Sequence, residues 1–597
     1  MLRSLADSDA LLRFSLLAIF TGLVAGLGAA VFRALIAFFH NLLFLGVFSL
    51  SYDANTHTPA SPWGVAVILV PVLGALAVTY LVKHYAPEAK GHGVPEVIDA
   101  IYYHGGVIRP TVAVIKSLAS AISIGSGGAI GREGPIIQIG AAFGSTVGQL
   151  IPLPRWQRLT LIACGAGGGI AATFNTPIGG LLFAIELILP EISSRTLIPV
   201  ALATGAATYV GRLFFGDFPA FTIPALALHV PGVLSAAGML AWIGFGVLLG
   251  VVSMIFIRAL YGFEDMFERM PGNDYTRHAL GMLLVGIMMY LLLRYTGHYA
   301  IQGVGYATIQ DILQQLLLHP GFLLLLFALK LLATSLTLGS GASGGIFSPS
   351  LFVGATLGGA YALLLAPLIP GAHLDIAGTA VIGMAGMVAG ATGAVVTAIV
   401  MIFEMTRDDN VISPLMITAS LAYGIRRALL RDSIYTMKLS RRGHNIPEAL
   451  QTNLYLMHSA RELLDVPMLR RAAADRTPLR KVLHARRRTP HILLVGDGRI
   501  AGLISADKVR RLDPDTGLSQ LFATHGSSDF ITVSADDSLF DVFIRLRDSR
   551  ADIALVTVPG DADSEKSVIG ALTWKQIAHA SNLPDALRRR RPAPESR

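Results

Sequence analysis

The chain has 597 residues, 53% of them hydrophobic and only 14% charged, and its mean hydropathy is +0.60. Such a composition excludes an ordinary water-soluble protein and predicts a polytopic α-helical membrane protein. The single cysteine, Cys164, excludes a disulfide framework or a cysteine-based metal centre within one chain, and no metal site is expected. The net charge of +8 requires no nucleic-acid partner, because basic residues beside a membrane segment bind lipid headgroups or stay solvated.

Long apolar runs predict the membrane-spanning helices. These runs cover residues 14–49, 63–83, 233–261, 278–293, 318–338 and 411–425. Residues 111–188 are also apolar, but Gly and Pro interrupt them, so short broken helices are expected there. The N-terminal segment carries acidic residues and no small-residue cleavage site follows it, which argues against a removable signal peptide. Arg and Lys cluster after the last run, so we expect a multi-pass protein of the cell inner (plasma) membrane with both termini in the cytoplasm.

The composition changes near residue 440, where the apolar runs stop and the share of charged residues rises. Residues 491–505 and 552–573 each read as strand, turn, strand, and residues 538–549 read as a helix before the second copy. We therefore predict a membrane domain over residues 1–440 and a soluble α/β unit, built twice, over residues 441–597.

The membrane domain contains an internal repeat. A shift of 214 residues places 116–144 on 330–358 without a gap, and 11 of the 29 aligned positions are identical. A shift of 218 aligns Gly165, Gly168, Ala171 and Glu186 with Gly383, Gly386, Ala389 and Glu404. The domain therefore consists of two related halves, about 10–215 and 230–440, and the Gly- and Pro-rich breaks occupy matching places in both.

Paired breaks of this kind point to a transport site near the middle of the bilayer. The sequences "GREGP" (131–135) and "GIFSP" (345–349) predict helix starts inside the membrane. Free N–H groups and the helix dipole attract anions at such starts, and glycine lets the backbone approach an ion closely. Glu133 would then be a tethered competitor for the anion, acting as a gate, a proton carrier or both. An ion pair with Arg132 or an ordinary helix cap is the structural alternative.

Together these motifs resemble the CLC family of chloride channels and chloride/proton antiporters, over roughly residues 10 to 440. The family pattern has three anion-pathway motifs, GSGIP, GREGP and GxFxP, which read here as "GHGVP" (91–95), "GREGP" (131–135) and "GIFSP" (345–349). The strand–turn–strand units behind them resemble a pair of CBS domains. The resemblance implies two halves of opposite orientation, and a homodimer with an independent pore in each subunit.

The resemblance also implies the anion site. It assigns the coordination of chloride or a similar small anion to the backbone N–H groups of Ile346 and Phe347 and to the hydroxyl of Tyr435, in "DSIYTMKLSRRG". Gly93 and Arg132 lie in the same motifs and are included in the expected anion site.

The first departure from the family pattern is His92, which stands where members that favour chloride usually have serine. A histidine can donate a hydrogen bond to the anion and gain charge as the pH falls. Alternatively, its ring turns away to a backbone carbonyl and a neighbouring N–H serves the anion. The anion selectivity is therefore left open by the sequence.

The second departure concerns the segment "FNTPIGGLLFAIELILPE", where proton-coupled members usually carry two successive glutamates. The first is Glu186, but Leu187 occupies the second position, which serves as the inner proton relay in most antiporters. Leucine cannot carry a proton, so the sequence favours passive, channel-like transport. An antiporter that uses Glu191 or water is the alternative. Glu186 and its repeat partner Glu404 are expected to be structural.

Two lysines in the repeats allow a functional and a structural interpretation. Lys116 and Lys330 occupy equivalent places in the repeats, where they add positive potential to the pore, or snorkel to an interface, or pair with the glutamates.

The CBS pair is expected to support a dimer or to bind an adenine nucleotide, although its motif is degraded. Ser505 has Asp507 only two residues on, and Thr573 has Gln576 where an aspartate is typical. No other cofactor is expected.

A remote alternative from another class is an intramembrane serine protease with Ser343 in "GASGG" as nucleophile and His373 as base. The protease leaves "GREGP", the repeat and the CBS pair unexplained. A primary pump is also disfavoured, because the chain has no Walker-type sequence. We therefore expect a transport protein rather than an enzyme.

Overall fold

The structure is a computed structural model of the chain, which divides into two compact units, Met1–Ala449 and Leu450–Arg597. It describes residues 2–151, 153–189, 192–218, 220–221, 235–407, 411–444, 446, 459–464, 468–483, 491–496, 499–504, 509, 513, 515–525, 530–549, 551, 553–558, 567–573 and 576–577. The domain boundary predicted near residue 440 stays a prediction, because most of the chain between 445 and 458 lies outside this range.

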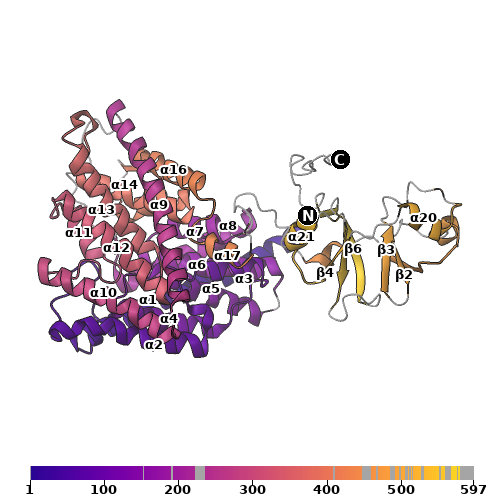
Figure 1. The fold of residues 1–597 in the computed structure, drawn as a ribbon, viewed down its shortest axis with the longest axis horizontal. Coiled ribbons are helices and arrows are strands. Elements are labelled where there is room, and N and C mark those ends of the chain that lie inside the picture. Colours follow the sequence, from indigo (N-terminus) through magenta and orange to yellow (C-terminus); the bar gives the residue numbers. More distant parts are fainter. Residues whose placement is uncertain are drawn as a thin grey trace. The chain divides into compact units, whose positions relative to one another are not determined.

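The membrane unit is entirely helical in its described part (Figure 1). Its first half contains α1 (Leu2–His40), α2 (Val70–Tyr85), α3 (Val94–Tyr102), α4 (Pro110–Gly125), α5 (Glu133–Leu150), α6 (Arg155–Phe174), α7 (Pro177–Phe183), a π-helical turn (Ala184–Ile188) and α8 (Ser194–Phe215). The second half contains α9 (Ala236–Arg269), α10 (Asp274–Thr296), α11 (Tyr306–Leu313), α12 (Pro320–Ser340), α13 (Phe347–Leu365), α14 (Ile376–Thr392), α15 (Val395–Thr406), α16 (Ile412–Leu429) and α17 (Thr436–Arg441).

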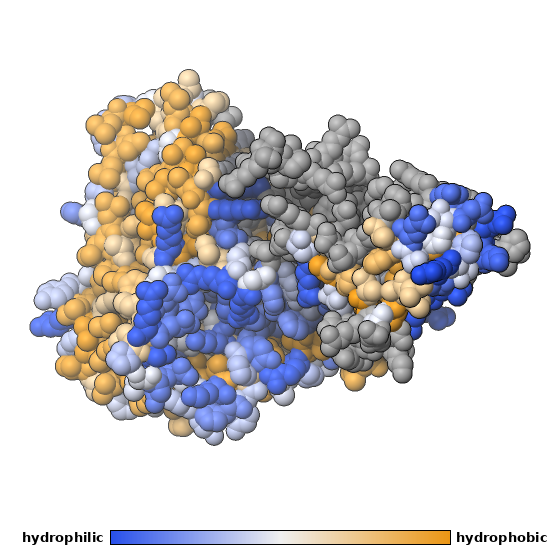
Figure 2. All heavy atoms as spheres, turned by 45° about the vertical axis from the view of Figure 1, so that its right-hand side comes forward, coloured by the Kyte–Doolittle hydropathy of each residue, from blue (hydrophilic) through white to orange (hydrophobic). Residues whose placement is uncertain are grey.

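Seven of the described helices are long and apolar enough to cross a membrane, and four shorter apolar helices accompany them. The predicted break of residues 111–188 into short helices is confirmed, since α4, α5, α6 and α7 replace a pair of long spans. Figure 2 shows hydrophobic side chains gathered on the surface of this unit. Leu16, Phe20 and Leu240 are among the exposed hydrophobic residues of the unit. Such a surface suits lipid rather than water.

A backbone bridge joins the two halves at equivalent residues. Gly131 and Gly345, which are equivalent in the 214-residue repeat, form an antiparallel bridge in which each N–H donates to the carbonyl of the other, at 2.7 and 2.6 Å. An antiparallel bridge between equivalent residues has local two-fold symmetry, as expected of two halves of opposite orientation.

Glycine pairs hold the helices of each half together. The backbones of α5 and α6 touch where Gly140 meets Gly165, and those of α13 and α14 touch where Gly354 meets Gly383. A Cβ at any of these positions would overlap the carbonyl group of the facing glycine. Close backbone approach through small residues is typical of membrane helices, which gain little from apolar burial against lipid.

The C-terminal unit contains two copies of one motif. The first sheet has the order β1 (Met468–Ala472), β2 (His491–Gly496), β3 (Arg499–Ile504), and the second has β4 (Phe530–Ser534), β5 (Ile553–Thr557), β6 (Val568–Thr573). In each sheet the first pair of strands is parallel and the second is antiparallel. Helices α18 (Leu479–Leu483), α20 (Leu518–His525) and α21 (Leu539–Ser549) accompany the strands. The predicted duplicated α/β unit is confirmed.

Candidate anion pathway

Three Gly-rich loops meet in the middle of the membrane unit. Besides the Gly131–Gly345 bridge, Gly91 N–H donates to the carbonyl of Ala342 at 2.9 Å, and Gly344 N–H donates to the carbonyl of Gly91 at 3.2 Å. The loops that contain "GHGVP", "GREGP" and "GIFSP" are therefore joined by backbone hydrogen bonds, although they lie far apart in the sequence.

Each loop leads into a helix, and the helices α3, α5 and α13 begin at Val94, Glu133 and Phe347. The first N–H groups of a helix have no intrahelical partner, so all three starts bring positive potential toward the loops. Ile346 immediately precedes α13, so its N–H and that of Phe347 lie at such a start, as expected of anion-coordinating groups.

Glycine is required where the loops approach one another. Gly93 has φ +83° and precedes α3, and a Cβ on it would lie 2.9 Å from both Gln138 Oε1 and the carbonyl oxygen of Gly134. A Cβ on Gly345 would lie 2.7 Å from the N–H nitrogen of Gly134. Side chains at these positions would separate the helix starts from one another.

The carboxylate of Glu133 occupies the start of α13. Its side chain is only 1% exposed. Oε2 accepts from the N–H of Ser348 at 3.2 Å, and Oε1 accepts from the hydroxyl of Tyr306 at 2.8 Å and from the hydroxyl of Ser348. A side-chain anion thus sits where a helix start favours negative charge.

Arg132 does not hold this carboxylate. Its guanidinium lies over the rings of Tyr306 and Phe174, 5.3 and 5.8 Å from their centroids, and its Nε is buried without a hydrogen-bond partner among the described residues. The ion pair considered for Glu133 and Arg132 is therefore wrong as an account of the carboxylate, which is partnered by the opposite half of the protein.

His92 lies between two tyrosine rings. Its ring centroid is 6.0 Å from that of Tyr435 and 6.4 Å from that of Tyr261. Nε2 lies 3.4 Å from the hydroxyl oxygen of Tyr261, whereas Nδ1 is buried and has no partner in the described part of the chain. The structure thus brings His92 and Tyr435 together, and their roles as anion ligands stay predictions. The alternative contact of His92 with a backbone carbonyl is not present among the described residues.

The two buried lysines hold loops. Lys116 Nζ donates to the carbonyls of Ala89 and Gly91 at 2.9 and 2.7 Å. Lys330 Nζ donates to the carbonyls of Ile301 and Gly303 at 2.8 and 2.7 Å. Neither snorkelling nor pairing with Glu186 or Glu404 is correct for these lysines, because both side chains are fully buried and bound to carbonyls. Their charge also lies directly behind the loops that lead into α3 and α11.

Glu186 and Glu404 cap helices of the opposite half. Glu186 accepts from the N–H groups of Val396 and Thr397 at the start of α15, at 3.2 and 2.8 Å. Glu404 accepts from the N–H groups of Ile178 and Gly179 at the start of α7, at 3.1 and 2.6 Å. These bonds agree with the structural role expected of both glutamates.

Leu187 belongs to the π-helical turn Ala184–Ile188, directly after Glu186. The side chain at position 187 is therefore a hydrocarbon, where proton-coupled members of the family usually have the glutamate of the inner proton relay. The possible substitute Glu191 lies outside the described residues.

Sequence reasoning missed Tyr306, Ser348 and Tyr261. A signal for Tyr306 was present in the sequence, since "GVGYA" (303–307) is the counterpart of "GHGVP" (91–95) in the second half. The structure agrees with this correspondence, because Lys116 binds the carbonyl of Gly91 and Lys330 binds the carbonyl of Gly303. Ser348 is one of the two variable residues of the third motif. Tyr261 lies on α9, outside every motif.

The protease alternative finds no support. Ser343 Oγ donates to the carbonyl of Ala89 at 2.7 Å and lies 2.9 Å from Ser120 Oγ. His373 follows the short 3₁₀ helix Pro370–Ala372 and has φ 46°, and no hydrogen bond joins it to Ser343 among the described residues. A serine without a base is no activated nucleophile.

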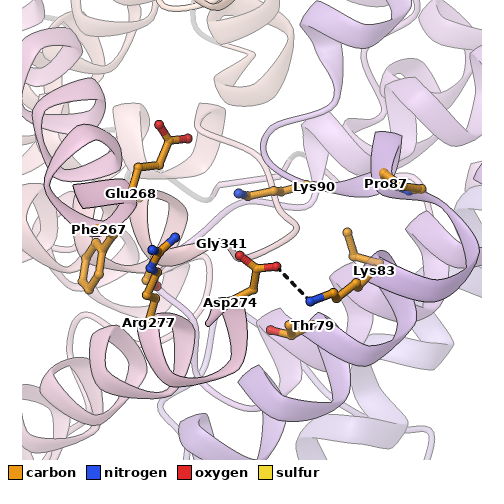
Figure 3. A pocket seen from close by; sticks show the side chains of 12 residues that line it. Thr79, Lys83, Pro87, Lys90, Phe267, Glu268, Asp274, Arg277 and Gly341 are labelled. Carbon is orange, nitrogen blue, oxygen red and sulfur yellow. Dashed lines mark ion pairs between the residues drawn. The ribbon is translucent and has the colours of Figure 1, made fainter. Parts of the chain in front are cut away.

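A cavity of about 200 Å³ lies beside the first loop (Figure 3). Lys90, Lys83 and Arg277 contribute positive charge to its wall, and Asp274 pairs with Lys83 at 3.5 Å. Its wall includes Gly339, which also lines a smaller recess at His92. The remaining residues of this recess are Gly91, Leu260, Glu264, Leu338 and Lys438.

Two halves of opposite direction, with broken helices that start beside a buried carboxylate, define a membrane transport protein whose site is built for a small anion. Comparison with known sequences names the family. The profile described as voltage gated chloride channel matches residues 74–427, and the CBS domain profile matches residues 525–582. The chain belongs to the voltage gated chloride channel (CLC) family of anion transport proteins.

Its relatives carry two kinds of name. A "Putative chloride channel protein ClcB-like" of Ralstonia nicotianae is 32% identical over 64% of this chain and 87% of its own length. An "H(+)/Cl(-) exchange transporter ClcA" of Cronobacter sakazakii is 31% identical over 71% of this chain and 89% of its own. A solved slow cyanobacterial Cl⁻/H⁺ antiporter is similar at TM-score 0.62 and 26% identity, over 72% of this chain and 98% of its own.

The similarity of fold extends to the C-terminal unit. A solved eukaryotic CLC transporter has a TM-score of 0.60 over 95% of this chain and 98% of its own, at 20% identity.

Proposed function

We propose that the protein conducts chloride, or a similar small anion, passively through a pathway in each subunit that Glu133 gates. The observation that carries this proposal is the position of the Glu133 carboxylate at the start of α13, where three donors bind it. Such donors bind a free anion equally well once the carboxylate has left. Protonation removes the negative charge of Glu133 and so weakens the attraction that holds its side chain at the start of α13.

Channel-like behaviour rests on Leu187, which cannot pass a proton from the inner side toward Glu133. Proton-linked exchange is the second candidate, because relatives named H(+)/Cl(−) exchange transporter share 31% identity with this chain. Exchange would need a proton route that avoids position 187, through Glu191, through water or through side chains of the pathway.

The test is anion flux from liposomes that contain the purified protein, recorded together with the pH inside. Passive transport predicts chloride movement down its gradient with no stoichiometric proton counterflow. A proton gradient that drives chloride uphill would overturn channel-like transport and establish exchange. Absence of any anion flux from verified proteoliposomes would overturn the proposed function itself. Repeating the recording with other halides and nitrate measures the selectivity that His92 sets.

The remaining features of the proposal concern assembly. We propose a homodimer in the inner (plasma) membrane, with both termini in the cytoplasm and the CBS pair acting as dimer support. Nucleotide sensing is the weaker candidate, since the hydroxyl and N–H of Thr573 both donate to Gln576 Oε1 at 2.8 Å. The other candidate residues, Ser505 and Asp507, lie outside the described part of the chain.

A further inference from the structure

The hydrogen-bond state of His92 follows from its neighbour Tyr261. The hydroxyl of Tyr261 lies 2.6 Å from the carbonyl oxygen of Ile434 and donates to it, because a carbonyl can only accept. That carbonyl is held in place, since the N–H of Ile434 donates to the carbonyl of Ala391 at 2.9 Å. The only proton of the Tyr261 hydroxyl is therefore committed.

The oxygen of Tyr261 then has only lone pairs to offer His92. A contact between this oxygen and Nε2, 3.4 Å apart, is favourable when Nε2 carries a hydrogen. A neutral imidazole has one N–H, so neutral His92 leaves a bare lone pair on Nδ1. Nδ1 is the atom that is buried and unpartnered among the described residues, on a side chain only 4% exposed.

A bare nitrogen lone pair repels an anion, whereas an imidazolium N–H donates to it. The ring that carries Nδ1 lies next to Tyr435, the expected anion ligand, and it lines the recess that leads toward Lys438. An anion at this point of the pathway therefore meets a favourable partner only after Nδ1 has gained a proton.

The charges around the ring have both signs. Lys438 from α17, Lys116 from α4 and Arg442 after α17 act on His92 as positive charges, and Glu96 from α3 acts as a negative one. Glu264 from α9 lines the same recess, and Tyr261 and Tyr435 are the neighbouring neutral hydroxyls. Because positive charges predominate around the ring, a positive charge on His92 is favourable chiefly when an anion binds beside it.

We propose that an anion binds beside His92 together with one proton, which Nδ1 takes up, and that Tyr261 is the positioning residue that makes this uptake necessary. The inference rests on the proposed anion pathway and adds the protonation step that accompanies anion binding at His92. The proton comes from water or buffer acid, it forms the Nδ1–H bond, and no group is oxidised or reduced.

The experiment is calorimetric titration of chloride into the purified full-length protein in detergent. The Glu133→Gln background removes the tethered competitor and its own titration. Binding measured in two buffers of different ionisation enthalpy gives the number of protons taken up per anion. At pH values where His92 of the free protein is neutral, we expect the uptake of about one proton per anion bound. The dissociation constant of chloride should then rise about tenfold for each unit by which the pH is raised.

The variants separate the two parts of the proposal. His92→Ser in the same background should abolish proton uptake and make binding independent of pH. Tyr261→Phe should also reduce uptake strongly, because the freed Nε2 lets neutral His92 carry its hydrogen on Nδ1. Tyr361→Phe is the matched control, since its hydroxyl donates to a backbone carbonyl, that of Ala241, at 2.8 Å, outside the pathway. It should keep the full uptake.

Chloride binding without proton uptake in the Glu133→Gln protein would overturn the inference while leaving the anion pathway intact. Full uptake retained in Tyr261→Phe would overturn the role of Tyr261. Absence of chloride binding in every variant would instead count against the proposed function.

Discussion

Replacement of Glu133 by glutamine tests the gate most directly. All three groups bonded to the carboxylate are donors, namely the hydroxyl of Tyr306, the hydroxyl of Ser348 and the N–H of Ser348. A glutamine of the same shape offers one acceptor oxygen, and its NH₂ group faces a donor. The variant therefore loses the charge and at least one hydrogen bond to it.

A hydrogen bond to a charged group contributes about 1.5–3 kcal/mol, which corresponds to about a 10- to 150-fold change in occupancy. A free anion should compete with the glutamine side chain more successfully by roughly this factor. In liposome efflux between about pH 4 and pH 8, the unmodified protein should gain flux as the pH falls and the carboxylate protonates. Glu133→Gln should give substantial flux throughout, with only the residual pH dependence that His92 contributes.

Glu88→Gln provides the control. Its carboxylate is 41% exposed and pairs with Arg109 at 2.6 Å, so the same chemical change occurs outside the pathway. This variant should keep the pH profile of the unmodified protein. The gate assignment is refuted if Glu133→Gln protein reconstitutes normally and still shows the original pH profile.

Three further outcomes are expected. Tyr306→Phe removes one donor to the Glu133 carboxylate, so the carboxylate should hold its place less firmly and flux at neutral pH should rise, about tenfold in the efflux assay. Lys116→Met removes one of the two donors to each of the carbonyls of Ala89 and Gly91, which should lower the free energy of unfolding by about 2 kcal/mol and appear as a lower Tm. Adenosine triphosphate should leave Tm unchanged, because Thr573 is committed to Gln576; a ligand at a hundred times its Kd would instead add about 2.7 kcal/mol.

The sequence predicted those features that depend on short-range pattern. Breaks at Gly and Pro located the starts of α5 and α13, and the 214-residue repeat predicted that the two would be equivalent. Helix limits were less predictable, because the apolar run 233–261 ends eight residues before α9 does, at Arg269. The last two turns of α9 are amphipathic, and hydropathy alone does not extend the helix through them.

The contacts of the site could not be predicted in the same way. Tyr306 reaches Glu133 and Tyr261 reaches His92 across 173 and 169 residues of sequence, from helices of the opposite half. No local pattern marks a hydroxyl that only the folded pairing of the halves brings to its partner. The lysines illustrate the same limit, since their spacing in the repeat was visible but their bonds to loop carbonyls were not.

Among the described residues, Glu133, Glu186 and Glu404 each accept hydrogen bonds at a helix start of the opposite half, and a comparison of their donors supports the proposal that Glu133 is the gate. Glu186 and Glu404 each accept from two backbone N–H groups, in the first turns of α15 and α7, and Glu186 also accepts from the hydroxyl of Thr397, so each links the two halves. Glu133 receives one such bond and otherwise depends on the hydroxyls of Tyr306 and Ser348. Hydroxyl donors rotate, and they can turn to a free anion without moving the backbone.

The surroundings of Glu133 also set it apart from Glu186 and Glu404. Its carboxylate lies against Gly131, where any Cβ would overlap it, at the point where glycine loops leave helix starts uncovered. His92, in the first of the three loops, has a buried Nδ1 without a hydrogen-bond partner among the described residues. The attraction of negative charge to helix starts therefore acts at all three glutamates, but backbone donors predominate at Glu186 and Glu404, whereas hydroxyl donors, which can rotate, predominate at Glu133.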